Sequence, residues 1–189
     1  MTLEQIPTES ALLVVDLQHG TTSAPSAHPI DEIVARAARL TDAWRRTGRT
    51  VVLASVDGTP PGRTTYQDGA QSWPEPFATV RPELGSDPDD VRVVRRSWSA
   101  LAGTGLHEQL AARRVQQVVV VGLATSFGVE STARAAYDLG YDVVVVSDAV
   151  TDRSREAHDH VLSRVVPALG QVATTDEILA LVDRPPLLS

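Results

Sequence analysis

The 189-residue chain contains no cysteine and no lysine, so all 17 of its basic residues are arginine. The first absence excludes a thiol nucleophile and a disulfide, and the second excludes Schiff-base chemistry on a lysine amine. A genome biased toward arginine codons would also deplete lysine everywhere, without regard to function. The absence of lysine is therefore a property of the whole composition, and an arginine at a given position does not by itself indicate a functional site.

The chain also lacks long hydrophobic runs and any excess of positive charge. Apolar stretches such as VVVVGLA are far too short to span a bilayer, and MTLEQIPTES lacks the basic and apolar regions of a signal peptide. A net charge of -7 and a pI near 5.1 argue against binding to a nucleic-acid backbone. With 42% hydrophobic residues, we expect one cytoplasmic domain over residues 1–189, with a small molecule or another subunit as partner.

Short apolar runs rich in β-branched residues alternate with segments of helical periodicity. The expected strands are 11–17, 49–57, 91–98, 116–124, 141–149 and a short edge strand at 170–175; the expected helices are 28–48, 103–115, 126–140, 154–169 and 174–182. Residues 58–92 have no steady period and many Gly and Pro residues, which indicates a long excursion of loops. The pattern predicts a three-layer α/β/α sandwich with a parallel, Rossmann-like sheet of about six strands.

Such sheets bind ligands at the carboxyl ends of their strands, and four of the expected strands carry polar groups there. These groups are Asp16 and Gln18 after the first strand, Asp57 after the second, Arg95 and Arg96 near the third, and residues 125–128 after the fourth. A carboxylate that ends an apolar strand is partly desolvated, which raises its pKa and suits it for proton transfer. Asp16 is therefore a candidate acid or base, although an aspartate here also fits as a cap for the following turn.

Four stretches of the chain, in their order and spacing, resemble the isochorismatase-like hydrolases, a family that includes nicotinamidases, N-carbamoylsarcosine amidases and isochorismatases. The stretches are LLVVDLQ, RRSWSALAGTGLHEQLAARRV, VVVVGLATSFGVESTARAAYDLGYDVVVVSDAVTD and TTDEIL, which together span nearly the whole chain. In most of this family an Asp, a Lys and a Cys form the active site. The resemblance places Asp16 at the Asp position, Arg95 at the Lys position and Gly128 at the Cys position.

Two of the three catalytic positions thus depart from the family's pattern. The stretch GLATSFGVESTARAAYDLGY is similar to a branch of the family that carries Gly where relatives carry Cys, but those relatives usually keep the Lys. The resemblance also implies a homodimer or homotetramer and a cis peptide bond between Leu123 and Ala124. We expect Gly128 to leave room where a thiol would lie, with the backbone N–H group of Phe127, Gly128 or Val129 facing Asp16 across a cavity.

Without a thiol, the family's nucleophilic route is closed. Ser126, Thr125 and Ser131 are weak substitutes, because no histidine lies near them in sequence to act as base. Hydrolysis of a vinyl ether needs no nucleophilic side chain, since a carboxylic acid protonates the enol carbon and water adds to the resulting cation. Asp16 would supply this proton to a small carboxylic-acid substrate.

Several further residues are candidates for binding that substrate. Gln18 would orient Asp16 or bind substrate, and Arg95 would hold the substrate carboxylate bidentately. Arg96 is the alternative anchor, and it fits equally well as a solvated surface charge. The loop residues Ala124 and Thr125 are further candidate contacts.

The few aromatic residues near these strand ends have two interpretations. Trp98 follows the arginine pair and Phe127 adjoins Gly128, so either could stack on a planar substrate or serve as a core or subunit contact. Trp73, in the Pro-rich excursion, would belong to a lid or to a dimer interface. We expect no metal and no other cofactor, because the segment after the second strand offers Asp57 and Asp68 but no histidine.

The competing hypothesis is a catalytically degenerate family member that acts as a binding or structural protein. Arg95 supports it, because an arginine does not give up its proton near neutral pH and cannot shuttle a proton as a lysine can. The polar groups at the other strand ends favour an enzyme.

Overall fold

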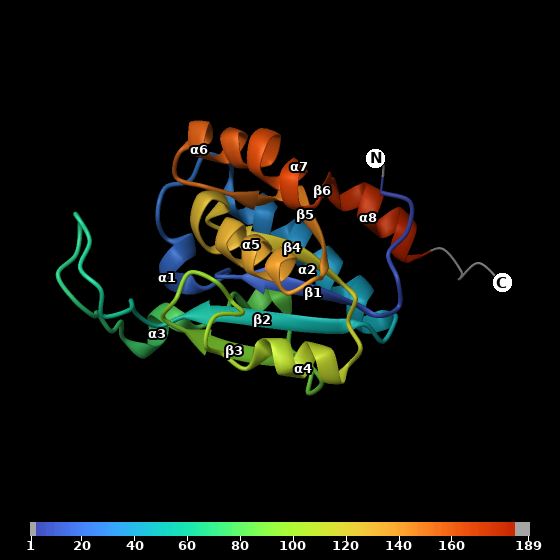
Figure 1. Cartoon of the computed structure of the whole chain (residues 1–189), viewed down its shortest axis with the longest axis horizontal. Helices are drawn as coiled ribbons and strands as arrows, with labels where there is room; N and C mark the ends of the chain where they lie inside the picture. The colour runs from blue at the N-terminus through green and yellow to red at the C-terminus, as the bar shows by residue number, and fades with distance from the viewer. Residues whose placement is uncertain (1–2, 184–189) are drawn as a thin grey trace.

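The computed structural model describes residues 3–183, and its centre is a six-stranded sheet (Figure 1). The strands are β1 Ser10–Val15, β2 Thr50–Val56, β3 Val91–Arg95, β4 Gln117–Leu123, β5 Asp142–Thr151 and β6 Gln171–Ala173. They lie in the order β3-β2-β1-β4-β5-β6, and every neighbouring pair is parallel. The predicted parallel α/β/α architecture is confirmed.

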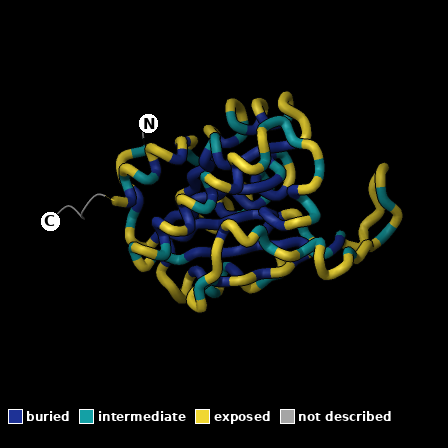
Figure 2. The backbone as a smooth tube through the Cα atoms, turned by 180° about the vertical axis from the view of Figure 1, so that it is seen from behind, coloured by how far each residue is buried: buried dark blue, intermediate teal, exposed yellow. Residues whose placement is uncertain are grey.

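The central strands β1, β2 and β4 are buried on both faces because helices cover both sides of the sheet, whereas the edge strand β3 exposes Arg92 and Val94. Along β1, Leu13 and Val15 belong to one hydrophobic cluster, whereas Leu12 and Val14 belong to the cluster on the opposite face. This alternation follows from the two-residue period of a strand. The buried interior of the sheet is visible as the continuous dark-blue strands of Figure 2.

Two helices cover one face of the sheet, and two further helices and a helical run cover the other. On the first face lie α2 Ile30–Arg46 and α8 Thr175–Val182, and on the second lie α4 Leu106–Ala112, α5 Glu130–Asp138 and the helical run of α6 Arg155–His160, η3 Val161–Val165 and α7 Val166–Leu169. Helix α2 buries Ile33, Ala37, Leu40 and Trp44, which recur at intervals of three and four residues. These helices match the expected ranges, with ends that differ by a few residues.

The main differences from the sequence analysis occur at the strand ends. Strand β1 stops at Val15 because Asp16 has a left-handed backbone conformation, with a φ of 53°, that turns the chain into the single turn α1 His19–Thr22. The expected helix 126–140 begins as a π-helical turn, η2 Thr125–Val129, and only then becomes α5. Both changes lie beside the candidate site.

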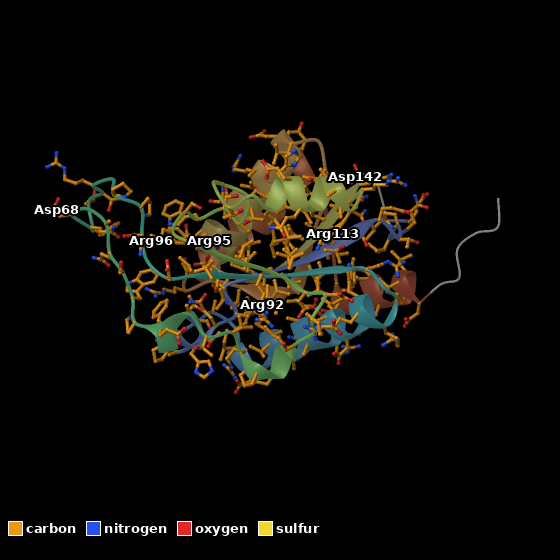
Figure 3. The ribbon with its side chains drawn as sticks, turned by 90° about the horizontal axis from the view of Figure 1, so that it is seen from below. Asp68, Arg92, Arg95, Arg96, Arg113 and Asp142 are labelled. Carbon is orange, nitrogen blue, oxygen red and sulfur yellow. The ribbon has the colours of Figure 1, made fainter. Side chains whose placement is uncertain are left out.

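The segment after β2 projects from the body as an arm (Figures 1 and 2). Figure 3 places Asp68 near its tip, and most residues from 60 to 72 are exposed. The chain then returns through α3 Glu75–Ala78 and the short η1 Pro82–Leu84, so the predicted excursion of loops contains two helical turns. Within residues 3–183, no helix has both the length and the apolar character needed to cross a membrane.

The end of this excursion is attached to α2 by a buried ion pair. Arg45 Nε and Nη2 donate to the two carboxylate oxygens of Asp90 at 3.1 and 2.9 Å, and only 2% of the Asp90 side chain is exposed. Because Asp90 directly precedes β3, this pair fixes the strand that carries Arg95.

Replacing Asp90 with Asn should lower the free energy of unfolding by about 3 kcal/mol, because it leaves the Arg45 charge without its buried partner. Urea denaturation measures the change. The control is Arg39→Ala, which removes the exposed Arg39–Asp176 pair at 2.7 Å and should change stability by less than about 0.5 kcal/mol. Equal effects of the two substitutions would contradict this account of the Arg45–Asp90 pair.

Candidate active site

Three chain segments bring Asp16, Arg95 and Gly128 together at the carboxyl edge of the sheet. Arg95 Nη2 donates to Asp16 Oδ2 at 2.9 Å, and a Cβ placed on Gly128 would lie 3.2 Å from the same oxygen. Figure 3 shows Arg95 at the end of the sheet from which the arm projects, with Arg113 and Asp142 at the opposite end. The three positions that the resemblance singled out are thus neighbours in space.

Asp16 is held in a largely dehydrated position. Its backbone N–H donates to Ala54 O at 2.8 Å, its carbonyl accepts from the Thr21 hydroxyl, and only 7% of the residue is exposed. Desolvation outweighs the attraction of the Arg95 guanidinium and raises the pKa of Asp16 to about 6. Oδ1 is buried without a hydrogen-bond partner in the described part of the chain, whereas Oδ2 accepts from Arg95.

The Arg95 side chain forms its hydrogen bonds within the protein. Besides its bond to Asp16, its Nη1 donates to Ser97 O at 2.7 Å, and its buried Nε has no partner within residues 3–183. The guanidinium is almost fully buried and presents no free fork to a ligand. This geometry corrects the prediction that Arg95 holds a substrate carboxylate bidentately, and it makes Arg95 the counter-charge of Asp16.

The Gln18 side chain also forms its hydrogen bonds within the protein, to backbone groups. It is fully buried, its Nε2 donates to Val56 O and Phe77 O at 2.8 and 2.9 Å, and its Oε1 accepts from Val56 N at 2.8 Å. The side chain ties the end of β2 to α3. This arrangement corrects the prediction that Gln18 orients Asp16 or binds substrate, because backbone groups occupy its amide.

The loop that carries Gly128 differs from its predicted form. The Leu123–Ala124 peptide bond is cis, as the resemblance implied, but the N–H groups of Phe127 and Val129 both donate to Ala124 O, at 3.0 and 3.2 Å. These two donors therefore do not face Asp16. A Cβ on Gly128 would also lie only 2.8 Å from Leu123 O, so the expected room for a thiol is absent.

Sequence reasoning missed Asp152, which anchors this loop. Asp152 is 2% exposed, and its Oδ2 accepts from both the N–H and the hydroxyl of Ser126 at 2.8 Å, while Oδ1 accepts from Ser154 N at 3.2 Å. Asp152 directly follows β5, just as Asp16 directly follows β1. The predicted strand 141–149 ended before Asp152, so the rule that singled out Asp16, a carboxylate ending an apolar strand, did not reach it.

Thr125 has a histidine partner that its sequence neighbourhood did not indicate. Thr125 Oγ1 lies 2.9 Å from His158 Nδ1, and both residues are buried. Desolvation lowers the pKa of His158, and the neighbouring His28 lowers it further. Thr125 is fully buried and its hydroxyl is bonded to His158, so this contact stabilises the loop.

The remaining predicted contacts lie on the surface. Trp98 and Phe127 are 58% and 46% exposed and form an edge-to-face pair with ring centroids 4.9 Å apart. Arg96 pairs with Asp57 at 3.2 Å in an exposed position, which matches the interpretation of Arg96 as a surface charge. The exposed rings are compatible with both interpretations of the aromatic pair, a planar ligand or a second subunit.

A cavity of about 300 Å³ adjoins the same loop. Leu123 and Ala124 form part of its wall, and Thr21, which bonds to the Asp16 carbonyl, forms another part. Trp73 and Phe77 also line it, with ring centroids 4.5 Å apart. One residue predicted to contact substrate, Ala124, therefore lines the cavity. The Pro-rich excursion contributes Trp73 and Phe77 to the cavity wall.

Gly128→Ala should destabilise the protein by about 1–3 kcal/mol, because the new methyl group overpacks Leu123 O and Val15 Cγ1. Thermal or urea denaturation measures the loss. Gly62→Ala is the control, since a Cβ at that exposed position meets no atom within 4 Å. A Gly128→Ala variant as stable as the Gly62→Ala variant would show that the loop has the room that the structure denies it.

Comparison with known proteins identifies one protein family and several relatives that are similar to this chain. The family model described as the isochorismatase domain matches residues 10–177. The chain is 34% identical to the uncharacterised isochorismatase family protein YecD of Escherichia coli O157:H7, covering 90% of this chain and 94% of that protein. It is 35% identical to YwoC of Bacillus subtilis, another uncharacterised member, covering 90% and 93%.

Among solved structures, an isochorismatase family protein from Burkholderia thailandensis superposes with a TM-score of 0.91 at 33% identity, covering 97% of this chain and all of that one. The family match spans most of the chain, and both sequence and structure agree over nearly the full length of these relatives. The chain therefore belongs to the isochorismatase family.

Proposed function

We propose that this chain is a hydrolase that acts on a small carboxylic-acid substrate by acid catalysis, with Asp16 as the acid and no side-chain nucleophile. The observation that carries the proposal is the state of Asp16: it is buried, its pKa is raised to about 6, and Oδ1 has no partner in the described chain. A general acid is most effective when its pKa lies near the working pH. The chain contains no cysteine, and position 128 is glycine.

Vinyl-ether hydrolysis fits these groups. The proton on Asp16 Oδ1 is transferred to the terminal carbon of the enol ether, and the neighbouring carbon becomes an oxocarbenium ion. Water adds to that carbon, and the proton it releases restores Asp16. The hemiketal then breaks its carbon–oxygen bond to give an alcohol and a ketone, so one water is consumed and no group remains on the protein.

Arg95 suits this route better than it suits the family's thiol chemistry. When Asp16 gives up its proton, the carboxylate that remains lies 2.9 Å from a permanent positive charge. The guanidinium stabilises the anion as it forms and need not release a proton at any step. An arginine at the lysine position is therefore compatible with acid catalysis.

The alternative function is that of a catalytically degenerate member that binds a ligand without turnover. The ion pair supports this alternative as well, because Asp16 Oδ2 is occupied by Arg95 and Oδ1 is buried. The tight packing around Gly128 points the same way, since the site no longer accommodates a nucleophile there. Turnover of enol ethers separates the two functions.

Asp16→Asn should lower the hydrolysis rate of a carboxylate-bearing enol ether by about 100-fold to 10,000-fold, the usual contribution of a general acid. The substitution keeps the shape of the side chain and removes only the acid. The release of the ketone is measured for a panel of such ethers, with circular dichroism to confirm folding. The control is Asp142→Asn, which changes an exposed aspartate at the opposite end of the sheet (Figure 3).

Retention of full activity by Asp16→Asn would eliminate Asp16 as the acid. If the parent protein binds members of the panel but hydrolyses none of them, the degenerate alternative holds and the enzyme proposal fails.

A further inference from the structure

At the carboxyl edge of the sheet, one arginine that lines a cavity has no partner among the described residues. Arg153 lies just beyond β5 and lines the cavity of about 300 Å³ described above, and within residues 3–183 it makes no hydrogen bond or ion pair. Three other arginines near this edge already have partners within the protein. Arg95 binds Asp16, Arg96 binds Asp57, and Arg155 donates to Ala27 O at 2.8 Å and lies 3.2 Å from the ring of His28.

The neighbouring Asp152 makes no ion pair with Arg153 in the described residues, although its negative charge lies in the same wall. Asp152 also lines the cavity, but three donors from Ser126 and Ser154 satisfy its carboxylate, and only 2% of the residue is exposed. Its oxygens are directed to the backbone and hydroxyl groups of the loop. Arg153 is exposed, so its guanidinium is the charged group available to a molecule that enters the cavity.

The rest of the wall is mostly apolar and partly aromatic, and the hydroxyls of its two polar residues, Thr21 and Ser26, donate to the backbone carbonyls of Asp16 and His28. Trp73 and Phe77 form a tilted ring pair with an interplanar angle of 36°, and Pro25, Ile30 and Leu123 complete the apolar lining. The volume lies at the lower end of the range for small-molecule sites, which suits a ligand about the size of a single ring. An apolar wall with one unpaired guanidinium is complementary to a flat body that carries one carboxylate.

We propose that Arg153 is a specificity-determining residue that pairs with the carboxylate of a planar, single-ring-sized acid, whose flat body packs against Trp73. This inference deepens the proposed function, because it assigns the substrate's anchor to a residue that the sequence analysis did not consider. Its use in catalysis rests on that proposed function. Its ligand contacts are independent of turnover, so binding alone tests them.

Calorimetric titration of the whole protein with benzoate and with benzamide, a neutral molecule of the same shape, tests the proposal. Benzoate should bind about 10-fold to 100-fold more tightly than benzamide, the usual effect of a hydrogen-bonded charge pair. Arg153→Gln should remove this preference and leave benzamide binding unchanged. The control is Arg164→Gln, which removes another arginine without a partner in residues 3–183, one outside this cavity.

Trp73→Ala tests the packing contact separately, and it should weaken benzoate and benzamide binding by the same factor. The proposal is overturned if neither probe binds the parent protein, if both bind equally, or if Arg153→Gln keeps the preference for benzoate. Asp16→Asn should still bind benzoate. If the parent binds benzoate through Arg153 but hydrolyses no enol ether, the proposed function fails and the carboxylate site stands. If hydrolysis persists without a benzoate preference, only the carboxylate site fails.

Discussion

The contact between Arg95 and Asp16 is the interaction on which the site depends. Two charges buried this deeply lose most of their hydration, and their attraction at 2.9 Å only partly offsets that loss. The remaining penalty falls on the carboxylate and raises the pKa of Asp16 to about 6. The pair thus combines a fixed positive charge with an acid that changes protonation near neutral pH, and the proposed chemistry needs both properties.

Backbone constraints at the ends of β1 and β4 bring Asp16 and the loop that carries Gly128 together. Asp16 has a positive φ of 53°, which turns its side chain out of the strand, and Gln18 then fixes the chain against Val56. On β4, Gly122 pairs in register with Val15, and a Cβ there would lie only 1.9 Å from Val15 O. Only glycine permits this approach, which brings the loop from Ala124 to Gly128 against Asp16.

Sequence alone predicted the sheet and the positions that meet at its edge. Runs of valine are strong signals for doubly buried strands, parallel strands place their carboxyl ends at one edge of the sheet, and the family resemblance grouped Asp16, Arg95 and Gly128 at that edge. The partners of each side chain were beyond this reasoning. Gln18 bonds to backbone groups of Val56 and Phe77, which become its neighbours only when β2 and the excursion fold over it.

The same limit explains the other differences from the sequence analysis. His158 reaches Thr125 from a distant helix, and no local signal connects them. The room beside Gly128 depends on how closely Leu123 O approaches, which composition and spacing do not determine. Asp152 was missed because β5 runs to Thr151, two residues beyond the predicted strand 141–149.

The most direct test of the role of Asp16 is its own titration, followed by carbon NMR of the side-chain carboxyl group in the intact protein. The Asp16→Asn spectrum assigns the signal. The structure predicts a midpoint near pH 6, well above the ordinary value of 3.8, because desolvation outweighs the Arg95 charge. A midpoint at or below 3.8 would mean that Asp16 remains an ionised partner of Arg95 at neutral pH, and it would contradict acid catalysis by this residue.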